Sequence, residues 1–331
     1  MNISKRMFQF VVVNPFRRVR HNPCCTFVQT AHASTGGAKS LQLSHRSLVR
    51  VCGSDSGTFL QGLITADVST LRDQHTLYSM ILNAQGRVLY DIILYHRDDN
   101  DQLLECDSRA AADIMKHLKR YALRAKVEIS SADADHKVWA LFPGCHGDSS
   151  HSSDSVFPDP RLNEFGTRIV TDSSTELLNS KYGATGATID EYHAHRLVTG
   201  LAEGVEEIPV ARCFPLEYNL DLQRGVSFDK GCYVGQELTA RTHHTGMVRK
   251  RVMPVSLGRS PKDKIPTGST LVNDKGKALG KLICYRGNIG LALLRVKESS
   301  QENVFLKEPT DSEQLQVFPH KPNWWPSDLI L

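Results

Sequence analysis

Two β-rich runs joined by a short turn place the strongest constraint on the fold of this chain. Leu77–Leu82 and Arg87–Tyr95 are rich in residues that favour strands, and Asn83–Gly86 between them is typical of a hairpin turn. A hairpin joins neighbouring strands in antiparallel orientation, because a parallel pair needs a much longer crossover connection. The sequence therefore predicts antiparallel sheets rather than a strict strand–helix–strand repeat.

Further strands and helices follow one another without a regular alternation. Short β-rich runs predict strands at 47–52, 103–106 and 126–129. Helices with an apolar face are predicted at 54–63, 110–123 and 188–198, with Gly200 as the stop of the last one. Beyond Met247, runs at 248–256, 269–272, 279–285 and 289–296 are separated by Gly, Pro, Asn and Asp. This mixture predicts an α+β fold with a small C-terminal β-barrel.

The chain of 331 residues is long enough for two folded regions. Apolar residues make up 40% and charged residues 23%, which permits a sizeable core and excludes global disorder. We expect a body over 37–244, with a polar Ser/His/Asp/Pro-rich surface loop at 144–160, and the barrel over 245–331. No run approaches the roughly 18 apolar residues of a membrane-spanning helix, so no membrane partner is expected.

The positive charge of the chain is concentrated at its N-terminus. Residues 1–54 hold eight Lys and Arg and no acid, since the first acidic residue is Asp55. The net charge of +4 thus leaves 32 basic against 36 acidic residues, or −4, for the remainder. An Arg-containing, acid-free arm over 1–36 is typical of a mitochondrial transit peptide and predicts the matrix as location, the alternative being a basic tail without an address. The acidic remainder disfavours a nucleic-acid partner.

The spacing of the cysteines excludes a compact metal site formed by this chain alone. The chain has eight, Cys24, Cys25, Cys52, Cys106, Cys145, Cys213, Cys232 and Cys284. The six beyond the arm contain no C-x-x-C pair, and without a secretory signal they are expected to be mostly free thiols. A self-contained zinc or iron–sulfur site is therefore not predicted, although one special thiol remains possible.

The segment Asp229–Glu237 is the most unusual in the chain. Two glycines, Gly231 and Gly235, bracket Cys232, and such glycines permit a positive φ or a close approach of the backbone to a ligand. Lys230 lies two residues before the thiol, and a helix can begin after Gly235. A nearby ammonium and a helix N-terminus both favour thiolate over thiol. The alternative is a tight turn around a buried, inert cysteine.

The motif K-G-C-Y-V-G-Q-E at Lys230–Glu237 is very similar to the signature of the YgfZ family, in the superfamily of the folate-binding glycine-cleavage T-protein. The resemblance extends from Leu41 to about Val296. It includes Phe59–Gly62, Thr65–Val68, Leu82–Arg87, Pro215–Asn219, Arg241, Gly246 and Arg249. It implies a ring-like α+β body with a folate-type pocket and a C-terminal β-barrel.

With its import-type arm, the chain most resembles the mitochondrial members, which assist the assembly of [4Fe-4S] proteins. The resemblance implies that Cys232 acts in this chemistry, with Lys230 beside it, and that A-type iron–sulfur carriers are the partners. A cluster normally takes four thiolates or equivalents, and Cys232 has no cysteine at a ligand-like spacing. Any cluster that it binds must therefore be shared with another protein or a small thiol.

The same resemblance implies a tetrahydrofolate-type ligand. Glu217 matches a pterin-contacting position, and a carboxylate can accept two hydrogen bonds from the donor edge of a pterin. Its alternative is an ordinary surface carboxylate or ion pair. Asn219, Asp91 and Arg241 are further candidates for binding this cofactor. Where the T-protein pattern has two adjacent acids, this chain has Tyr90 and Asp91, which disfavours aminomethyl transfer.

An assembly factor is therefore favoured over an enzyme, and two other functions stay open. One is a folate-dependent one-carbon transferase with Asp91 as acid and base, which Tyr90 disfavours. The other is an RNA-modification accessory protein that uses the basic strip Arg249–Arg251, which the acidic remainder of the chain disfavours. His243 and His244 are expected to be structural or phosphate-contacting residues, since adjacent side chains point apart.

Overall fold

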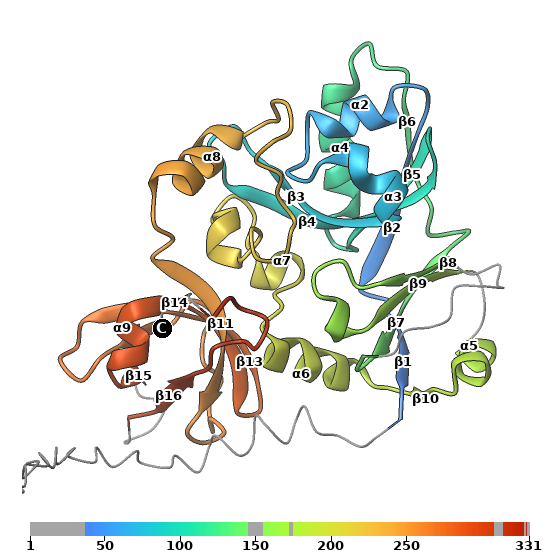
Figure 1. Cartoon of the computed structure of the whole chain (residues 1–331). Helices are drawn as coiled ribbons and strands as arrows, with labels where there is room; N and C mark the ends of the chain where they lie inside the picture. The colour runs from blue at the N-terminus through green and yellow to red at the C-terminus, as the bar shows by residue number, and fades with distance from the viewer. Residues whose placement is uncertain (1–36, 145–154, 172–174, 308–313, 328, 330–331) are drawn as a thin grey trace, which may run out of the picture. The chain divides into compact units, whose positions relative to one another are not determined.

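Two five-stranded sheets and a closed six-stranded barrel carry the described part of the chain (Figure 1). The computed structural model describes residues 37–329 apart from 145–154, 172–174, 308–313 and 328. The predicted transit peptide, 1–36, lies outside the described residues. The predicted α+β fold with its C-terminal β-barrel is confirmed.

The first sheet contains the hairpin that the sequence predicts. Its strands lie in the order β3 (Thr76–Leu82), β4 (Val88–Asp98), β5 (Asp101–Asp107), β2 (Arg46–Cys52) and β6 (Glu128–Ser131). All of its neighbouring strands pair antiparallel. The turn between β3 and β4 is closed by the Asn83 carboxamide oxygen, which accepts hydrogen bonds from the backbone N–H groups of Gln85 and Arg87.

The second sheet has the order β10 (Thr185–Gly186), β1 (Lys39–Gln42), β7 (Lys137–Phe142), β9 (Thr167–Thr171) and β8 (Ser155–Pro158). Its β1–β10 pair is parallel, which the hairpin signals did not predict. Strand β8 lies in the predicted loop 144–160 and pairs with β9, so that prediction is wrong for 155–158. The reason is that Phe157 packs against the core while Asp159 is buried and ion-paired.

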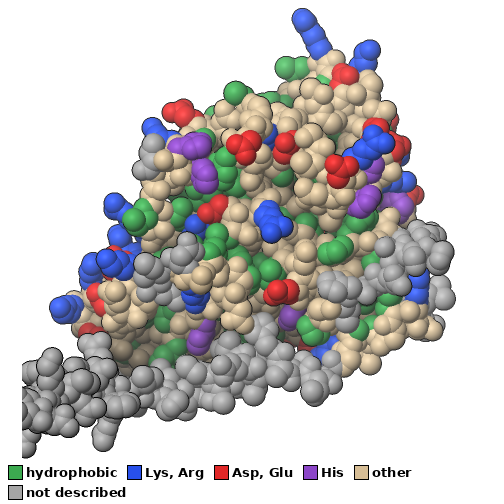
Figure 2. All heavy atoms as spheres, viewed as in Figure 1, with side chains coloured by type: hydrophobic (Ala, Val, Ile, Leu, Met, Phe, Trp, Pro, Cys, Tyr) green, Lys and Arg blue, Asp and Glu red, His purple; other side chains and the backbone are tan. Residues whose placement is uncertain are grey.

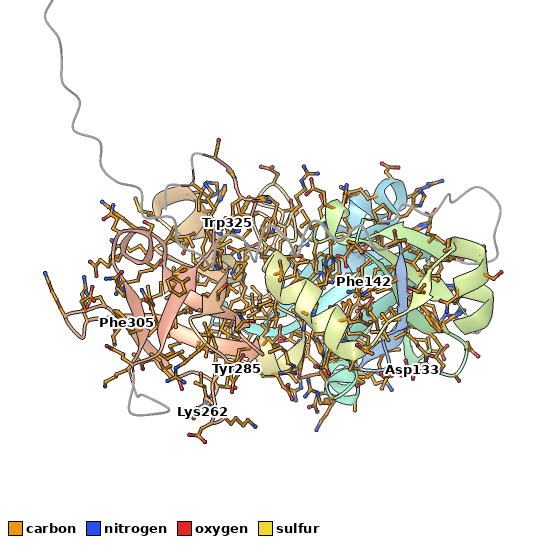
Figure 3. The ribbon with its side chains drawn as sticks, turned by 90° about the horizontal axis from the view of Figure 1, so that it is seen from below. Asp133, Phe142, Lys262, Tyr285, Phe305 and Trp325 are labelled. Carbon is orange, nitrogen blue, oxygen red and sulfur yellow. The ribbon has the colours of Figure 1, made fainter. Side chains whose placement is uncertain are left out.

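The barrel closes through β11 (Lys250–Leu257), β14 (Ile289–Arg295), β13 (Ala278–Arg286), β12 (Thr270–Val272), β15 (Val304–Leu306) and β16 (Gln316–Pro319). Strand β16 returns to pair with β11, so neither is left as an open edge. Its interior is apolar and includes Trp325, whereas Phe142 belongs to a cluster of the body (Figure 3).

Helices occupy the connections. They are α2 (Ser56–Gln61), α3 (Leu71–Gln74), α4 (Ala111–Ala122), α5 (Thr175–Tyr182), α6 (Ile189–Thr199), α7 (Gly204–Glu207), α8 (Gln236–Thr245) and α9 (Val296–Gln301), with 3-10 turns η1 (Val68–Thr70), η2 (Asn163–Phe165) and η3 (Pro215–Tyr218). Helix α4 buries Ile114 and Leu118 against the first sheet. Helix α6 begins with a capping box of Thr188 and Glu191. It ends at Gly200, at φ +87°, which is the predicted stop.

A network of charged side chains lies buried in the body. Its fully enclosed members are Arg46, Arg161, Arg168, Arg196, Asp91, Glu105, Asp159 and Glu203. Glu203 accepts hydrogen bonds from Arg161, Arg168 and the Tyr192 hydroxyl, at 2.7, 3.1 and 2.8 Å. Buried charges are tolerated only when they are paired in this way. The network therefore links β2, β4, β5, β9, the β8–β9 connection and α6 with the segment that follows it.

Candidate functional site

The side chain of Lys230 holds the cysteine loop to the body. Its ammonium donates hydrogen bonds to the carbonyl oxygens of Ile64 at 2.9 Å and Ala66 at 2.7 Å, and it lies 5.1 Å from the centre of the Tyr233 ring. Burial lowers the pKa of Lys230 to about 8, and the neighbouring carboxylate of Asp67 opposes this shift. In this structure Lys230 therefore acts as an anchor of the loop, whereas the sequence suggested activation of the thiol.

The residues after Cys232 anchor the loop a second time. The backbone N–H of Val234 donates to Gly62 O at 3.0 Å, and Tyr233 is buried. Gly235 has φ +81°, and a Cβ at this position would lie 2.3 Å from Asn83 O in the β3–β4 turn. Gly231 has no such restriction, since a Cβ there would meet open space. Of the two bracketing glycines, only Gly235 is thus required by the packing.

Between these anchors Cys232 is exposed, unlike the other cysteines that the structure describes. Cys106 and Cys213 are buried, while Cys52 and Cys284 are half-buried. Burial raises the pKa of Cys106 to about 12 and also raises that of Cys213. The alternative of a buried, inert Cys232 is therefore wrong. Helix α8 begins four residues later, at Gln236, as the motif predicts.

In the part of the chain that the structure describes, Cys232 has no partners for a metal site. Within the described residues, no group of three or more His, Cys, Asp and Glu side chains could hold a metal ion. The nearby His243 ring stacks on Phe228 with 3.6 Å between ring centres, and His244 lies against His243. The stack ties α8 to the segment before the loop, which fits the predicted structural role of these histidines.

A large cavity opens beside the cysteine loop. Its volume is about 960 Å³, and its walls come from 66–78, 158–164, 222–229 and Trp324. Gln223 in its wall is 4% exposed, and its side-chain oxygen has no hydrogen-bond partner in the described part of the chain. Tyr78, Phe228 and Trp324 add aromatic surface. An enclosed acceptor without a donor is what a polar ligand would satisfy.

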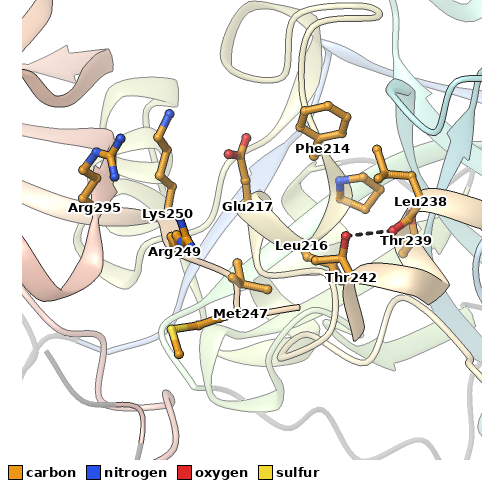
Figure 4. A pocket seen from close by; sticks show the side chains of 12 residues that line it. Phe214, Leu216, Glu217, Leu238, Thr239, Thr242, Met247, Arg249, Lys250 and Arg295 are labelled. Atoms are coloured by element: carbon orange, nitrogen blue, oxygen red, sulfur yellow. Dashed lines mark hydrogen bonds between the residues drawn. The ribbon is translucent and has the colours of Figure 1, made fainter. Parts of the chain in front are cut away.

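Glu217 lies outside this cavity, in a smaller one of about 350 Å³ (Figure 4). We call it the η3–α8 cavity. Its lining is Phe214, Pro215, Leu216, Glu217, Leu238, Thr239, Thr242, Met247, Val248, Arg249, Lys250 and Arg295. Burial raises the pKa of Glu217, against the opposing charges of Lys250 and Arg87.

The other predicted cofactor-binding residues do not join Glu217. Asn219 is buried and donates to Val252 O at 2.8 Å, so it fastens η3 to the barrel. Asp91 is 3% exposed, lies 3.4 Å from Arg46 and accepts from the backbone of Gly204 at 3.1 Å. Burial raises the pKa of Asp91, and Arg46 opposes that shift. Arg241 is exposed on α8. The predicted single pocket is therefore wrong for this set of residues.

The basic strip Arg249–Arg251 is not continuous either. Arg251 is buried and forms two hydrogen bonds with Asp221, at 2.8 and 2.7 Å. Lys250 lines the η3–α8 cavity, and only Arg249 is exposed. On the face shown in Figure 2, basic and acidic side chains are interspersed. This arrangement gives no support to a nucleic-acid surface at the strip.

Comparison with known proteins agrees with these features. The chain is 36% identical over 94% of its length to the iron–sulfur cluster assembly factor IBA57, mitochondrial, of Homo sapiens, with 93% of that protein covered. The Mus musculus protein of the same name is 37% identical over 86% of the chain and 85% of its own length. The chain belongs to the IBA57 family. The resemblance that the motif indicated is thereby confirmed.

Two domain-family matches and one solved structure agree with the fold described above. The GCVT N-terminal domain matches residues 11–142, and the CAF17 C-terminal beta-barrel domain matches 249–327. The crystal structure of glycine cleavage system aminomethyltransferase T from Bartonella henselae superposes with a TM-score of 0.71. It is 17% identical, with 90% of this chain and 89% of that chain covered, so it shows a shared fold. This chain thus combines a T-protein-type body with this barrel.

The IBA57 relatives are named mitochondrial proteins, in agreement with the predicted location. No helix among the described residues has the length and apolar character needed to cross a membrane. Sequence reasoning missed the buried charge network, whose members are scattered from 46 to 203 without a local pattern. It also missed Gln223 and Thr239, because an unpaired buried atom becomes visible only in three dimensions.

Proposed function

We propose that this protein assists the maturation of [4Fe-4S] proteins in the mitochondrial matrix, with Cys232 as one ligand of a cluster shared with a partner. The observation that carries the proposal is an exposed thiol on a loop that Lys230 and Gly235 hold in place. The names of the relatives and the composition of the arm support the process and the compartment. The cluster is cargo, not a resident cofactor.

The shared ligand set follows from the chemistry of the cluster. A cluster takes four thiolates or equivalents, and Cys232 supplies one. Exposure lets the thiol of another protein approach on the open side of the loop. We propose an A-type iron–sulfur carrier as that partner, because such a carrier can bring a cluster together with the remaining thiolates.

We expect the purified protein alone to hold no stable cluster. Mixing it with a cluster-loaded A-type carrier should change the thiolate-to-iron absorption in the visible range, because Cys232 replaces one ligand of the cluster. Cys52→Ser, which alters a half-buried thiol in β2, is the matched control and should behave as wild type. An unchanged spectrum with well-folded wild type, or an equal change with Cys232→Ser, would refute the shared cluster.

We further propose that the large cavity takes a folate-type ligand. Its volume of about 960 Å³ exceeds what a folate needs, and Tyr78, Phe228 and Trp324 provide faces for a ring. The unpaired oxygen of Gln223 accepts an N–H of a pterin, and the exposed Arg224 lies in the wall for a carboxylate. Arg161 also lines the wall, but it is already paired with Asp159 and Glu203. The enclosure of Asp91 removes the acid that one-carbon transfer would use.

A reduced folate should bind the purified protein, and Gln223→Leu should weaken binding roughly 3- to 10-fold through loss of one hydrogen bond. Calorimetry measures this directly. The prediction from the sequence is instead that Glu217→Ala weakens binding by about one to two decades. The two variants therefore decide between the cavities, and no folate binding by well-folded wild type would remove the ligand from the mechanism.

A further inference from the structure

The η3–α8 cavity has a cationic side, polar groups without hydrogen-bond partners and an apolar side. The proposals above for the cluster and for folate binding in the large cavity assign no role to this cavity. Figure 4 shows Arg295, Lys250 and Arg249 on one side, Phe214, Leu238 and Thr239 on the other, and Glu217 between them. Its walls come from η3 and α8 of the body and from β11 and β14 of the barrel. A volume of about 350 Å³ suits a small molecule.

The cationic side is arranged to meet an acid. Lys250 and Arg295 stand opposite each other in the β11–β14 ladder, so their side chains share one face. Like charges directly opposite destabilise a sheet unless an anion compensates them. Arg295 has a partial counter-charge in Glu298 at 3.6 Å, and Arg249 beside them is exposed. A carboxylate bound here would complete the pairing of Lys250.

Glu217 and Thr239 supply the polar groups that still lack partners. No described residue donates a hydrogen bond to the Glu217 carboxylate, and burial raises its pKa. Thr239 is 3% exposed and its hydroxyl is unpaired, whereas the hydroxyl of Thr242 donates to Leu238 O at 2.8 Å. A buried hydroxyl without a partner and a half-buried carboxylate without a hydrogen-bond donor both cost stability unless a ligand satisfies them.

The opposite side is apolar. Phe214, Leu216 and Leu238 line it, and Met247 is 80% exposed. Across the cavity, the cationic side chains of Lys250 and Arg295 are thus followed by the Glu217 carboxylate and then by the apolar wall. We propose that the η3–α8 cavity binds a small α-amino acid with an apolar side chain. Its carboxylate faces Lys250 and Arg295, its ammonium faces Glu217, and its side chain packs on Phe214 and Leu238.

L-Phenylalanine and two analogues test each contact of this arrangement. 3-Phenylpropionate lacks the ammonium and phenethylamine lacks the carboxylate, while both keep the ring. Calorimetry at pH 7.4 should give L-phenylalanine a Kd of roughly 0.1–1 mM, as expected for a ligand of its size. Each analogue should bind at least about 10-fold more weakly, since each loses a charge-assisted interaction.

Two variants assign the contacts to residues. Glu217→Gln should weaken L-phenylalanine about 10-fold and abolish the preference over 3-phenylpropionate. Lys250→Met should abolish the preference over phenethylamine. Lys281→Met, at an exposed position on β13, and Gln223→Leu, in the large cavity, are controls that should keep wild-type affinity. Loss of binding in Gln223→Leu would show that the amino acid binds in the large cavity instead, and it would overturn the proposal.

The unliganded protein provides a second measurement. Glu217→Gln and Thr239→Val should each melt at or slightly above the wild-type temperature. The first removes the charge of a half-buried carboxylate that accepts no hydrogen bond from a described residue, and the second removes a buried hydroxyl without a partner among the described residues. A lower melting temperature for both variants would show that these groups serve the fold. Absence of binding by wild type at 10-fold above the expected Kd, or equal binding of all three compounds, would also defeat the proposal.

Discussion

The Cys232→Ser protein is expected to fold as wild type does and to leave [4Fe-4S] enzymes inactive in cells depleted of the endogenous protein. The change is nearly isosteric, and the Cys232 side chain is exposed. The hydrogen bonds that hold the loop are made by Lys230 and by the backbone of Val234, so the substitution leaves them in place. A serine hydroxyl is a far poorer ligand for iron than a thiolate, so the loss should be close to complete. Activities of [4Fe-4S] and [2Fe-2S] enzymes measured side by side report the effect.

Three other cysteines provide the controls for this experiment. Cys52, Cys106 and Cys284 lie in strands β2, β5 and β13, and their replacement by Ser or Ala should change stability alone. The melting temperature of purified Cys232→Ser should equal that of wild type. Full rescue by a stably expressed Cys232→Ser protein would rule out the thiolate mechanism. A lowered melting temperature with retained rescue would instead establish a structural role for this residue.

Glu203→Ala should destabilise the protein by about 3–5 kcal/mol, the usual cost of breaking a buried ion pair by removing one partner. Its carboxylate accepts from Arg161, Arg168 and Tyr192, all of which are buried, and each of them would lose one partner. Urea denaturation followed by circular dichroism measures the free energy of unfolding. Glu206→Ala, three residues later on the exposed side of α7, is the control and should cost less than about 1 kcal/mol.

The same residue predicts a pH dependence. Burial alone would raise the pKa of Glu203, but the guanidinium groups of Arg161 and Arg196 outweigh it and hold the pKa well below its usual range. An acid with a depressed pKa in the folded state stabilises the fold above its unfolded pKa of about 4.3, and this stability is lost as the pH falls further. Glu203→Ala should therefore lose less stability on acidification than wild type, and an equal loss would contradict the pairing.

The sequence by itself determined the features that depend on neighbouring residues. The β3–β4 hairpin follows from Asn83–Gly86, and the ends of α6 follow from Thr188 and Gly200. The start of α8 after Gly235 belongs to the same group, whereas the exposure of Cys232 was left open by the sequence and decided by the structure. Each of these signals acts over a few residues, since caps and turns are satisfied by hydrogen bonds within one segment.

Only the tertiary structure decided where the charged side chains of the predicted site point. Lys230 donates to carbonyl oxygens more than 160 positions earlier in the chain. The Asp91 side chain points into the buried charge network that also contains Glu203. Glu217 and the large cavity are separated for the same reason. A motif specifies which side chains are present, but the packing of distant strands and helices selects their partners. The desolvation of each charge therefore depends on contacts that no local pattern in the sequence contains.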